Sequence, residues 1–198
     1  MIKTKKYKIC RRLGPGVYEK CQTPKFAMSG SAPKRGKGRG ASEFSSQLLE
    51  KQKIRFMYGV SEKQFRKYVD EATSKKGVAP TKTLHDLLER RLDNVIFRTG
   101  VASGRTLARQ LVSHGHITVN GRKLTVPSYL VKVGDKIAVR DGSKKSPLFA
   151  ELPKRLKNHN TPSWVKFDPE IAAGEIKATP DMTDEGLAFN TVLEYYSR

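Results

Sequence analysis

The sequence contains few cysteines and no close cluster of metal ligands. Its 198 residues include two cysteines and four histidines. Ten residues separate Cys10 from Cys21, and the histidines lie far from both in the sequence. A tetrahedral zinc site needs four ligands, usually at close spacing, so we predict neither a metal nor a cofactor. A disulfide between the two cysteines is not expected either, because reducing compartments disfavour it.

Long apolar runs are also missing. The chain has no stretch that would span a bilayer and no basic amphipathic anchor. Its opening, M-I-K-T-K-K-Y-K-I, is too short and too poor in serine for a transit peptide. We therefore expect a soluble intracellular protein of one or two domains, and we disfavour an acidic membrane as its partner.

Acidic residues are scarce relative to basic ones. The chain has 39 Lys plus Arg and 19 Asp plus Glu, which gives a formal net charge of +20. Residues 1–82 carry 21 basic and 6 acidic side chains, residues 83–148 carry 12 and 5, and residues 149–198 carry 6 and 8. Such an excess favours a polyanionic partner, and nucleic acid is the usual one. The acidic C-terminal part is expected to contact protein instead.

Residues 1–42 show neither helical nor strand periodicity. They include P-K-R-G-K-G-R-G at 33–40, a composition that buries too little apolar surface to fold alone. The segment is either a disordered tail or an arm that becomes ordered on RNA phosphates. We favour the arm and expect it to lack order in the free protein. Its predicted RNA-binding residues are Lys3, Lys5, Lys6, Arg11, Arg12, Lys34, Arg35, Lys37 and Arg39.

Two helices are predicted after the arm. The first spans roughly residues 42–58, and the second opens with an S-x-x-Q capping box at 61–64. Apolar residues at 65, 69 and 72 fall on one face of the second helix. Gly77 and Pro80 then indicate a linker. The predicted RNA-binding residues of the two helices are Lys51, Lys53, Arg55, Lys63, Arg66 and Lys67.

Residues 83–141 predict a compact module. A leucine-rich helix should run from Thr83 to a stop at Gly100, and a second helix should follow at 103–112 with Ser103 as its N-cap. The Asn-Gly pair at 120–121 predicts a type I′ hairpin, and another strand is expected at 136–140. Guanidinium groups near a helix start suit phosphate. The predicted RNA-binding residues here are Arg90, Arg91, Arg105, Arg109, Arg122 and Lys123.

The leucine-rich helix contains R-L-D at 91–93 and T-G at 99–100, which resembles the catalytic signature of pseudouridine synthases. Asp93 is then either a nucleophile or a helix residue within reach of Arg90 or Arg91. A synthase carries a large catalytic domain after this module, and the 57 residues that follow Asp141 are too few for a domain of ~100–150 residues. P-loop, nucleophile-elbow and synthetase signatures are missing. We therefore predict that Asp93 is structural and that the protein is not an enzyme.

The chain resembles one family over nearly its whole length. Residues 83–141, with L-V-S-H-G-H-I-T-V-N-G and V-G-D-K-I-A-V-R after the helices, resemble the S4 RNA-binding module. The flanks resemble bacterial small-subunit ribosomal protein S4, through Q-L-L-E-K-Q-K-I-R-F-M-Y-G-V-S-E-K-Q-F-R-K-Y at 47–68 and V-L-E-Y-Y-S at 192–197. Many members bind zinc through two cysteine pairs. Cys10 and Cys21 remain single here, so the chain resembles the zinc-free branch.

The resemblance implies an α+β fold with an extended basic N-terminal arm, a helical domain, and an S4 RNA-binding module of two helices packed on a small antiparallel sheet. The expected boundaries are 1–42 for the arm, 43–82 for the helical domain, which a C-terminal helix at 187–198 joins, 83–141 for the module and 142–186 for an extension. Short strands are expected in the extension near Trp164–Phe167 and Glu175–Ala178.

The resemblance also implies partners. They are the 5′ domain of 16S rRNA at a multi-helix junction, mRNA at the entry tunnel, ribosomal protein S5 and other small-subunit proteins. The expected role is to nucleate subunit assembly in the cytoplasm and to contribute to decoding accuracy. Two alternatives stay open: an RNA-modifying enzyme of the pseudouridine synthase class and a ribosome-associated stress factor with the same module. The predicted protein-contact residues are Leu187, Phe189, Leu193, Tyr195 and Tyr196.

Overall fold

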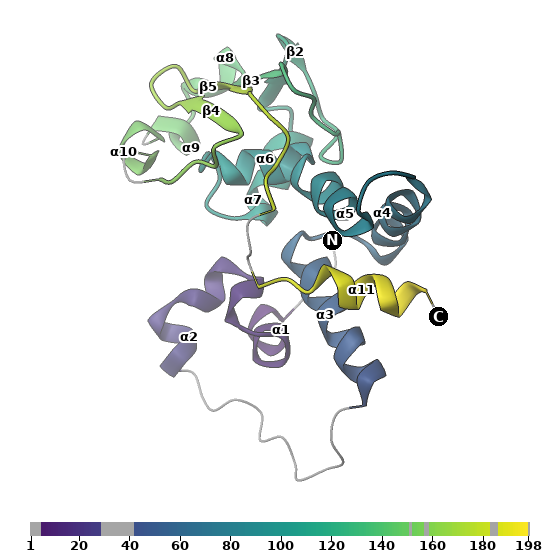
Figure 1. The fold of residues 1–198 in the computed structure, drawn as a ribbon. Helices are drawn as coiled ribbons and strands as arrows, with labels where there is room; N and C mark the ends of the chain where they lie inside the picture. The colour runs from purple at the N-terminus through teal and green to yellow at the C-terminus, as the bar shows by residue number, and fades with distance from the viewer. Residues whose placement is uncertain (1–4, 29–41, 151, 157–158, 183–185, 198) are drawn as a thin grey trace. The chain divides into compact units, whose positions relative to one another are not determined.

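The computed structural model describes residues 5–28, 42–150, 152–156, 159–182 and 186–197. The chain divides into two compact units (Figure 1). The first unit contains residues 1–84 and 184–198, and the second contains residues 85–183. The first is helical, and the second combines helices with a five-stranded sheet, which confirms the predicted α+β class. No helix within the described ranges is both long and apolar enough to cross a bilayer.

The first unit begins with a small helical lobe. Its elements are α1 (Lys6–Leu13), η1 (Pro15–Val17), η2 (Glu19–Gln22) and α2 (Pro24–Met28). Cys10, Val17 and Cys21 are buried at its centre, and the two cysteines form a disulfide. The rings of Tyr7 and Phe26 pack against this core with their centroids 5.5 Å apart. Two predictions were therefore wrong, because residues 5–28 are folded and the cysteines are bonded to each other.

Two longer helices and the C-terminal helix complete the first unit. Helix α3 (Glu43–Met57) begins where Ser42 accepts a hydrogen bond from the Ser45 amide, and α4 (Glu62–Ser74) begins where Ser61 accepts one from the Gln64 amide, each at 3.3 Å. Both caps satisfy amides at a helix start and confirm the predicted helices. Helix α11 (Phe189–Tyr196) packs against α3 (Figure 1).

The leucine-rich segment forms two helices instead of the one predicted. They are α5 (Pro80–Glu89) and α6 (Leu92–Arg98). The break comes at Arg91, where the chain pairs with the segment around Leu130. The Leu92 amide donates to the Tyr129 carbonyl at 2.8 Å, and the Val131 amide donates to the Arg90 carbonyl at 2.9 Å. These hydrogen bonds replace helical ones at the break. The apolar residues keep their helical spacing on both sides of it, so their spacing in the sequence does not show where the helix is interrupted.

Helix α7 (Arg105–Ser113) also differs at its start from the prediction. Its N-cap is Gly104, which makes no side-chain hydrogen bond. The prediction that Ser103 caps this helix was therefore wrong. The glycine adopts an extended backbone conformation just before the helix begins.

All strand pairs of the second unit are antiparallel, in the order β2-β1-β3-β5-β4. The strands are β1 (Ile117–Val119), β2 (Arg122–Lys123), β3 (Lys136–Val139), β4 (Val165–Asp168) and β5 (Ala173–Ile176). Asn120 and Gly121 have φ values of 50° and 78°, as a type I′ turn requires, so the predicted hairpin is confirmed. Strand β3 is confirmed as well.

The core of the second unit lies on one face of this sheet. Along β1 and β3, buried residues such as Ile117 and Ile137 alternate with exposed or half-buried ones such as Thr118 and Lys136. Buried residues of α6 and α7 pack onto the same core cluster. Three short helices follow β3 before β4: α8 (Asp141–Lys144), α9 (Pro147–Ala150) and α10 (Leu152–Leu156). The opposite face, called the open face below, carries exposed or half-buried residues such as Thr118, Lys136 and Ala138.

Candidate nucleic-acid interface

Helix α4 carries an exposed basic face in the first unit. Phe65 and Val69 are buried, so the helical period leaves Lys63, Arg66 and Lys67 exposed. Within the part of the chain that the structure describes, these three side chains form no ion pair. Their charges therefore remain available to a phosphate backbone.

A second basic group lies in the second unit, on α7 and on the β1–β2 hairpin. Arg109, Arg122 and Lys123 are all exposed. The Lys123 side chain crosses the turn at Gly115 so closely that a Cβ atom there would collide with it. The Gly115 amide closes the end of α7 on the Val112 carbonyl at 2.8 Å. The hairpin thus brings a cation to the C-terminal end of α7, where the helix dipole favours positive charge.

The turn between α7 and β1 adds two histidines to this surface. The rings of His114 and His116 lie 6.2 Å apart, and Nδ1 of His116 lies 3.0 Å from the Ser143 hydroxyl. Burial and the nearby charges of His114, Arg140 and Lys123 hold the pKa of His116 below its ordinary value. An anion bound here would relieve that repulsion and raise the pKa again.

Arg105 is held against α6 and is only partly exposed. Its Nε donates to Oδ1 of Asn94 at 2.8 Å, and its guanidinium lies over the Phe97 ring, 4.3 Å from the centroid. Arg105 and Arg109 therefore do not form the equivalent pair that their spacing predicts. Arg109 is exposed, whereas Arg105 is oriented by its neighbours before any ligand arrives.

The basic residue Lys51 of α3 is part of the fold of the first unit. It is 5% exposed, and its Nζ lies 2.8 Å from Oε1 of Glu62 and 4.4 Å from the centroid of the Tyr195 ring. The Tyr196 hydroxyl donates to the same Glu62 oxygen at 2.7 Å. Burial raises the pKa of Glu62, but the hydrogen bonds from Lys51 and Tyr196 outweigh it and leave the pKa below its ordinary value. The same carboxylate and burial raise the pKa of Tyr196.

The two other basic residues predicted on α3 also have internal partners. Arg55 donates to Oε1 of Gln52 from both Nε, at 3.0 Å, and NH2, at 2.7 Å. Lys53 donates to the Gly186 carbonyl at 3.1 Å. All three cations of α3 are therefore engaged within the first unit, and Lys51 is buried away from any phosphate.

Arg91 is likewise buried in an ion pair. It is 1% exposed, and it donates to Asp93 from Nε at 3.0 Å and from NH2 at 2.7 Å. Asp93 is 3% exposed and also accepts the Asn94 amide at 2.9 Å. The predicted pairing of Asp93 with a neighbouring arginine is confirmed, and neither side chain reaches the surface. Arg90 is half-buried and donates to the Val131 carbonyl at 2.8 Å.

The aromatic residues of α11 contact other residues of the first unit, but only Phe189 is buried, and Tyr195 and Tyr196 are half-buried. Phe189 is buried, and the Tyr196 ring packs 6.2 Å from the Phe65 ring. Leu187 and Leu193 are partly exposed. Of the five residues predicted to contact another protein, the three aromatic ones thus have contacts inside the chain.

The structure describes only part of the predicted basic arm. Lys5, Arg11 and Arg12 are exposed in the N-terminal lobe, and the Lys6 ammonium lies over the Tyr18 ring, 5.3 Å from its centroid. The remaining predicted residues lie outside the described ranges: Lys3, Lys34, Arg35, Lys37 and Arg39.

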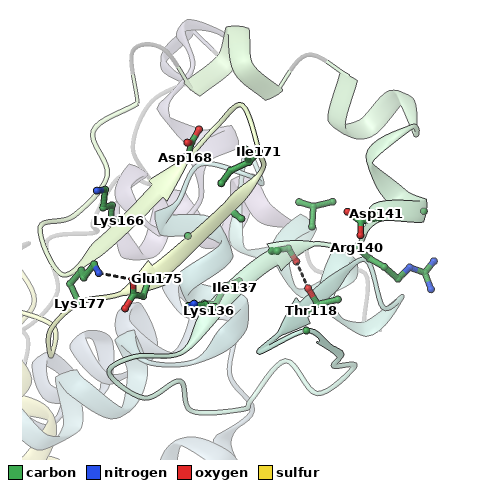
Figure 2. Close-up of a pocket in the computed structure, with 16 residues that line it drawn as sticks. Thr118, Lys136, Ile137, Arg140, Asp141, Lys166, Asp168, Ile171, Glu175 and Lys177 are labelled. Carbon is green, nitrogen blue, oxygen red and sulfur yellow. Dashed lines mark hydrogen bonds and ion pairs between the residues drawn. The ribbon is translucent and has the colours of Figure 1, made fainter.

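Sequence reasoning missed a trough of about 710 Å³ on the open face of the sheet. Its charged lining residues, drawn in Figure 2, are Lys136, Arg140, Asp141, Lys166, Asp168, Glu175 and Lys177. The strand register places Lys136 and Lys166 on either side of Glu175, which also accepts a hydrogen bond from Lys177 at 2.5 Å. Carboxylates interleave with cations here, so the trough attracts phosphate less than α4 does. Strands so far apart in the sequence give no local signal of this arrangement.

The comparison with known proteins agrees with the fold. Residues 1–89 match the family described as ribosomal protein S4/S9 N-terminal domain, and residues 90–137 match the S4 domain. The chain is 45% identical over 200 residues to small ribosomal subunit protein uS4 of Pelotomaculum thermopropionicum, and the match covers 96% of each chain. It is 43% identical over 201 residues to uS4 of Thermus thermophilus, again with 96% of each chain covered. The chain belongs to the uS4 family of small ribosomal subunit proteins.

Proposed function

We propose that this chain is a primary rRNA-binding protein, which recognises the 5′ domain of 16S rRNA and nucleates assembly of the small subunit. Its family and its S4 domain make it a structural RNA-binding protein of that subunit and not an enzyme. The observation that supports the proposal is that some of its basic side chains are exposed and others are buried. Lys63, Arg66 and Lys67 of α4 and the hairpin residues Arg122 and Lys123 stay exposed, whereas Lys51 and Arg91 are buried in ion pairs.

The exposed cations set the expected salt dependence. One phosphate contact from each of the six exposed cations in the two basic groups would give a slope of log affinity against log salt of about −5 on a duplex. These cations are Lys63, Arg66, Lys67, Arg109, Arg122 and Lys123. Affinity should then fall roughly 10³-fold between ~50 and ~200 mM salt. Because phosphate contacts carry no sequence information, preference for one RNA has to come from the shape of its junction and from contacts with its bases.

Binding to the 5′-domain fragment, beside an unrelated structured RNA of equal length across a salt series, tests the proposal. A preference for the 5′ domain that survives moderate salt is expected. Replacing Lys63, Arg66 and Lys67 by alanine should reduce the salt slope by about three. The charge-matched control replaces three exposed lysines outside the two basic groups: Lys132, Lys144 and Lys145. Equal and equally salt-sensitive binding to both RNAs would contradict the proposal.

Sedimentation separates this function from that of a stress factor with the same module. A ribosomal protein should remain in the small subunit at one copy through a high-salt wash. A factor would be substoichiometric and would wash off.

We further propose contacts with ribosomal protein S5, with other small-subunit proteins and with mRNA at the entry tunnel, which would link the chain to decoding accuracy. Because Phe189 is buried, the half-buried residues of this segment are better placed to meet S5: Leu187, Leu193, Tyr195 and Tyr196. Cross-linking of assembled subunits, followed by identification of the linked peptides, tests the protein contacts.

A further inference from the structure

A groove of about 550 Å³ runs between α1 and α3 in the first unit. Its lining residues are Lys5, Lys8, Ile9, Arg12 and Leu13 from the α1 side and Leu48, Gln52 and Phe56 from α3. The lining residues of α1 recur three or four positions apart, and those of α3 recur every four. Each helix therefore offers one continuous face to the groove. The volume falls within the range of about 300–1,000 Å³ that is typical of small-ligand sites.

The groove has an apolar floor and a purely cationic rim. Ile9, Leu13, Leu48 and Phe56 are half-buried, while Lys5, Lys8 and Arg12 are exposed. Among the described residues, no acidic side chain lines it, in contrast to the trough on the sheet, which contains three carboxylates. Such a site complements a ligand with an apolar, planar body and a negatively charged edge. A nucleotide has both, because its base buries apolar faces and its phosphate carries the charge.

Gln52 adds a directional group to the groove. Its Oε1 accepts both hydrogen bonds from Arg55, which fixes the amide so that oxygen faces the guanidinium. The Nε2 group of Gln52 makes no hydrogen bond to any of the described residues, so it retains two N–H donors. Donors select a ligand edge with acceptors. Every base presents such acceptors: uracil, cytosine and guanine have exocyclic carbonyl oxygens, and adenine has ring nitrogens such as N7.

From these features we infer that the groove binds one unpaired nucleotide of the RNA, with the base against Leu48 and Phe56, an acceptor atom of the base at Gln52, and the phosphates at Lys8 and Arg12. The inference rests on the proposed function, since it concerns the same RNA. The surface described so far contacts phosphates alone, and the groove adds a contact with a base.

Ultraviolet cross-linking of the full chain to RNA, followed by mass spectrometry, tests the site directly. The expected adduct is a single nucleotide on the α3 peptide, at Leu48, Gln52 or Phe56. An RNA that is abasic at this nucleotide should bind wild-type protein roughly ten-fold more weakly, given the usual strength of base stacking.

Two variants probe the floor and the donor. Leu48→Trp fills the groove, and Gln52→Leu removes the donors at similar volume. Leu48→Trp should weaken RNA binding roughly ten-fold, leave the salt slope unchanged, and make the protein insensitive to the abasic substitution, because the base can no longer enter the groove. Gln52→Leu keeps the stacking surface, so it should weaken binding to intact RNA more than binding to the abasic RNA, and thereby reduce the effect of the abasic substitution without abolishing it. Circular dichroism establishes that each variant is folded. If Leu48→Trp fails to fold, Gln52→Leu with the abasic RNA decides alone.

Two lysine substitutions, one in the groove and one outside it, test the cationic rim. Lys8→Ala should lower the salt slope by about one, whereas Lys25→Ala, an exposed lysine of the same lobe outside the groove, should leave it unchanged.

The cross-link and the variants are scored on both the 5′-domain fragment and the unrelated RNA, so the groove is judged even if the two bind equally. Equal binding by the wild-type chain would refute the proposed function alone. A preserved preference for the 5′ domain, with unchanged affinity in both groove variants and no adduct at the α3 peptide, would refute the groove alone. Loss of binding to phosphatidylglycerol vesicles in Leu48→Trp, with RNA binding intact, would assign the groove to a lipid headgroup and overturn the inference.

Discussion

Asp93→Asn should destabilise the second unit by about 3–5 kcal/mol, the usual cost of removing one partner from a buried ion pair. Arg91 is 1% exposed and Asp93 3%, and two hydrogen bonds of 2.7 and 3.0 Å join them. Asparagine preserves the shape and one acceptor oxygen, but it removes the charge. The Arg91 guanidinium would then be a buried cation that has lost the negative charge of Asp93. A loss of this size is a large fraction of the ~5–15 kcal/mol that stabilises an ordinary domain.

Urea unfolding followed by tryptophan fluorescence measures this loss. Trp164 is the single tryptophan of the chain, and it is buried in the core cluster of the second unit, so its emission reports that unit. The unfolding midpoint of Asp93→Asn should decrease at an unchanged slope. Asp168→Asn, which neutralises an exposed carboxylate, serves as control and should stay within about 0.5 kcal/mol of wild type.

A neutral replacement of both partners separates charge from packing. The double variant Arg91→Met, Asp93→Leu should recover much of the stability that Asp93→Asn loses, because no isolated charge remains. At a temperature where it is folded, Asp93→Asn should bind RNA with the wild-type salt slope. A midpoint shift of less than about 0.5 kcal/mol in Asp93→Asn would refute the reasoning, and so would a double variant less stable than the single one.

Three further predictions concern stability. Cys10→Ser, which removes the disulfide with its sequence separation of 11, should destabilise the N-terminal lobe by about 3 kcal/mol and expose it to limited proteolysis. Glu62→Gln should cost about 2 kcal/mol in thermal unfolding, because buried Lys51 loses its charged partner. Since the pKa of Glu62 is lowered from 4.5, its contribution is present above pH 4.5 and lost as the pH falls through the lowered value. The pKa of His116 is lowered from 6.5, so protonation of His116 does not reduce the free energy of unfolding above pH 6.5 but reduces it as the pH falls below that value. His116→Gln should abolish this pH dependence in fluorescence-monitored unfolding.

Much of the fold could be predicted because its signals are local. The caps at Ser42 and Ser61 each satisfy an amide three residues away, and the turn at Asn120-Gly121 depends on two adjacent backbone angles. Each of these interactions involves residues within a stretch of four, so a single sequence is enough to predict them.

The break between α5 and α6 could not be predicted in this way. It depends on two backbone hydrogen bonds to residues near Leu130, some forty positions later in the chain: the Arg90 carbonyl accepts one and the Leu92 amide donates the other. The folded N-terminal lobe was missed for a related reason. Its core consists of Cys10, Val17 and Cys21, too few residues to produce a period, and a covalent bond and aromatic packing hold it together.

The candidate interface was predicted in kind but not residue by residue. A net charge of +20 is the same whether a given cation is exposed or buried, so it identifies a polyanionic partner without identifying the contacts. Lys51 lies in the same kind of basic helix as Lys63, yet its partners are Glu62 and a tyrosine near the C-terminus. Two measurements separate such residues. Neutralising Lys63 should change the salt slope of RNA binding and leave stability alone, whereas neutralising Lys51 should lower stability and leave the slope of the folded protein alone.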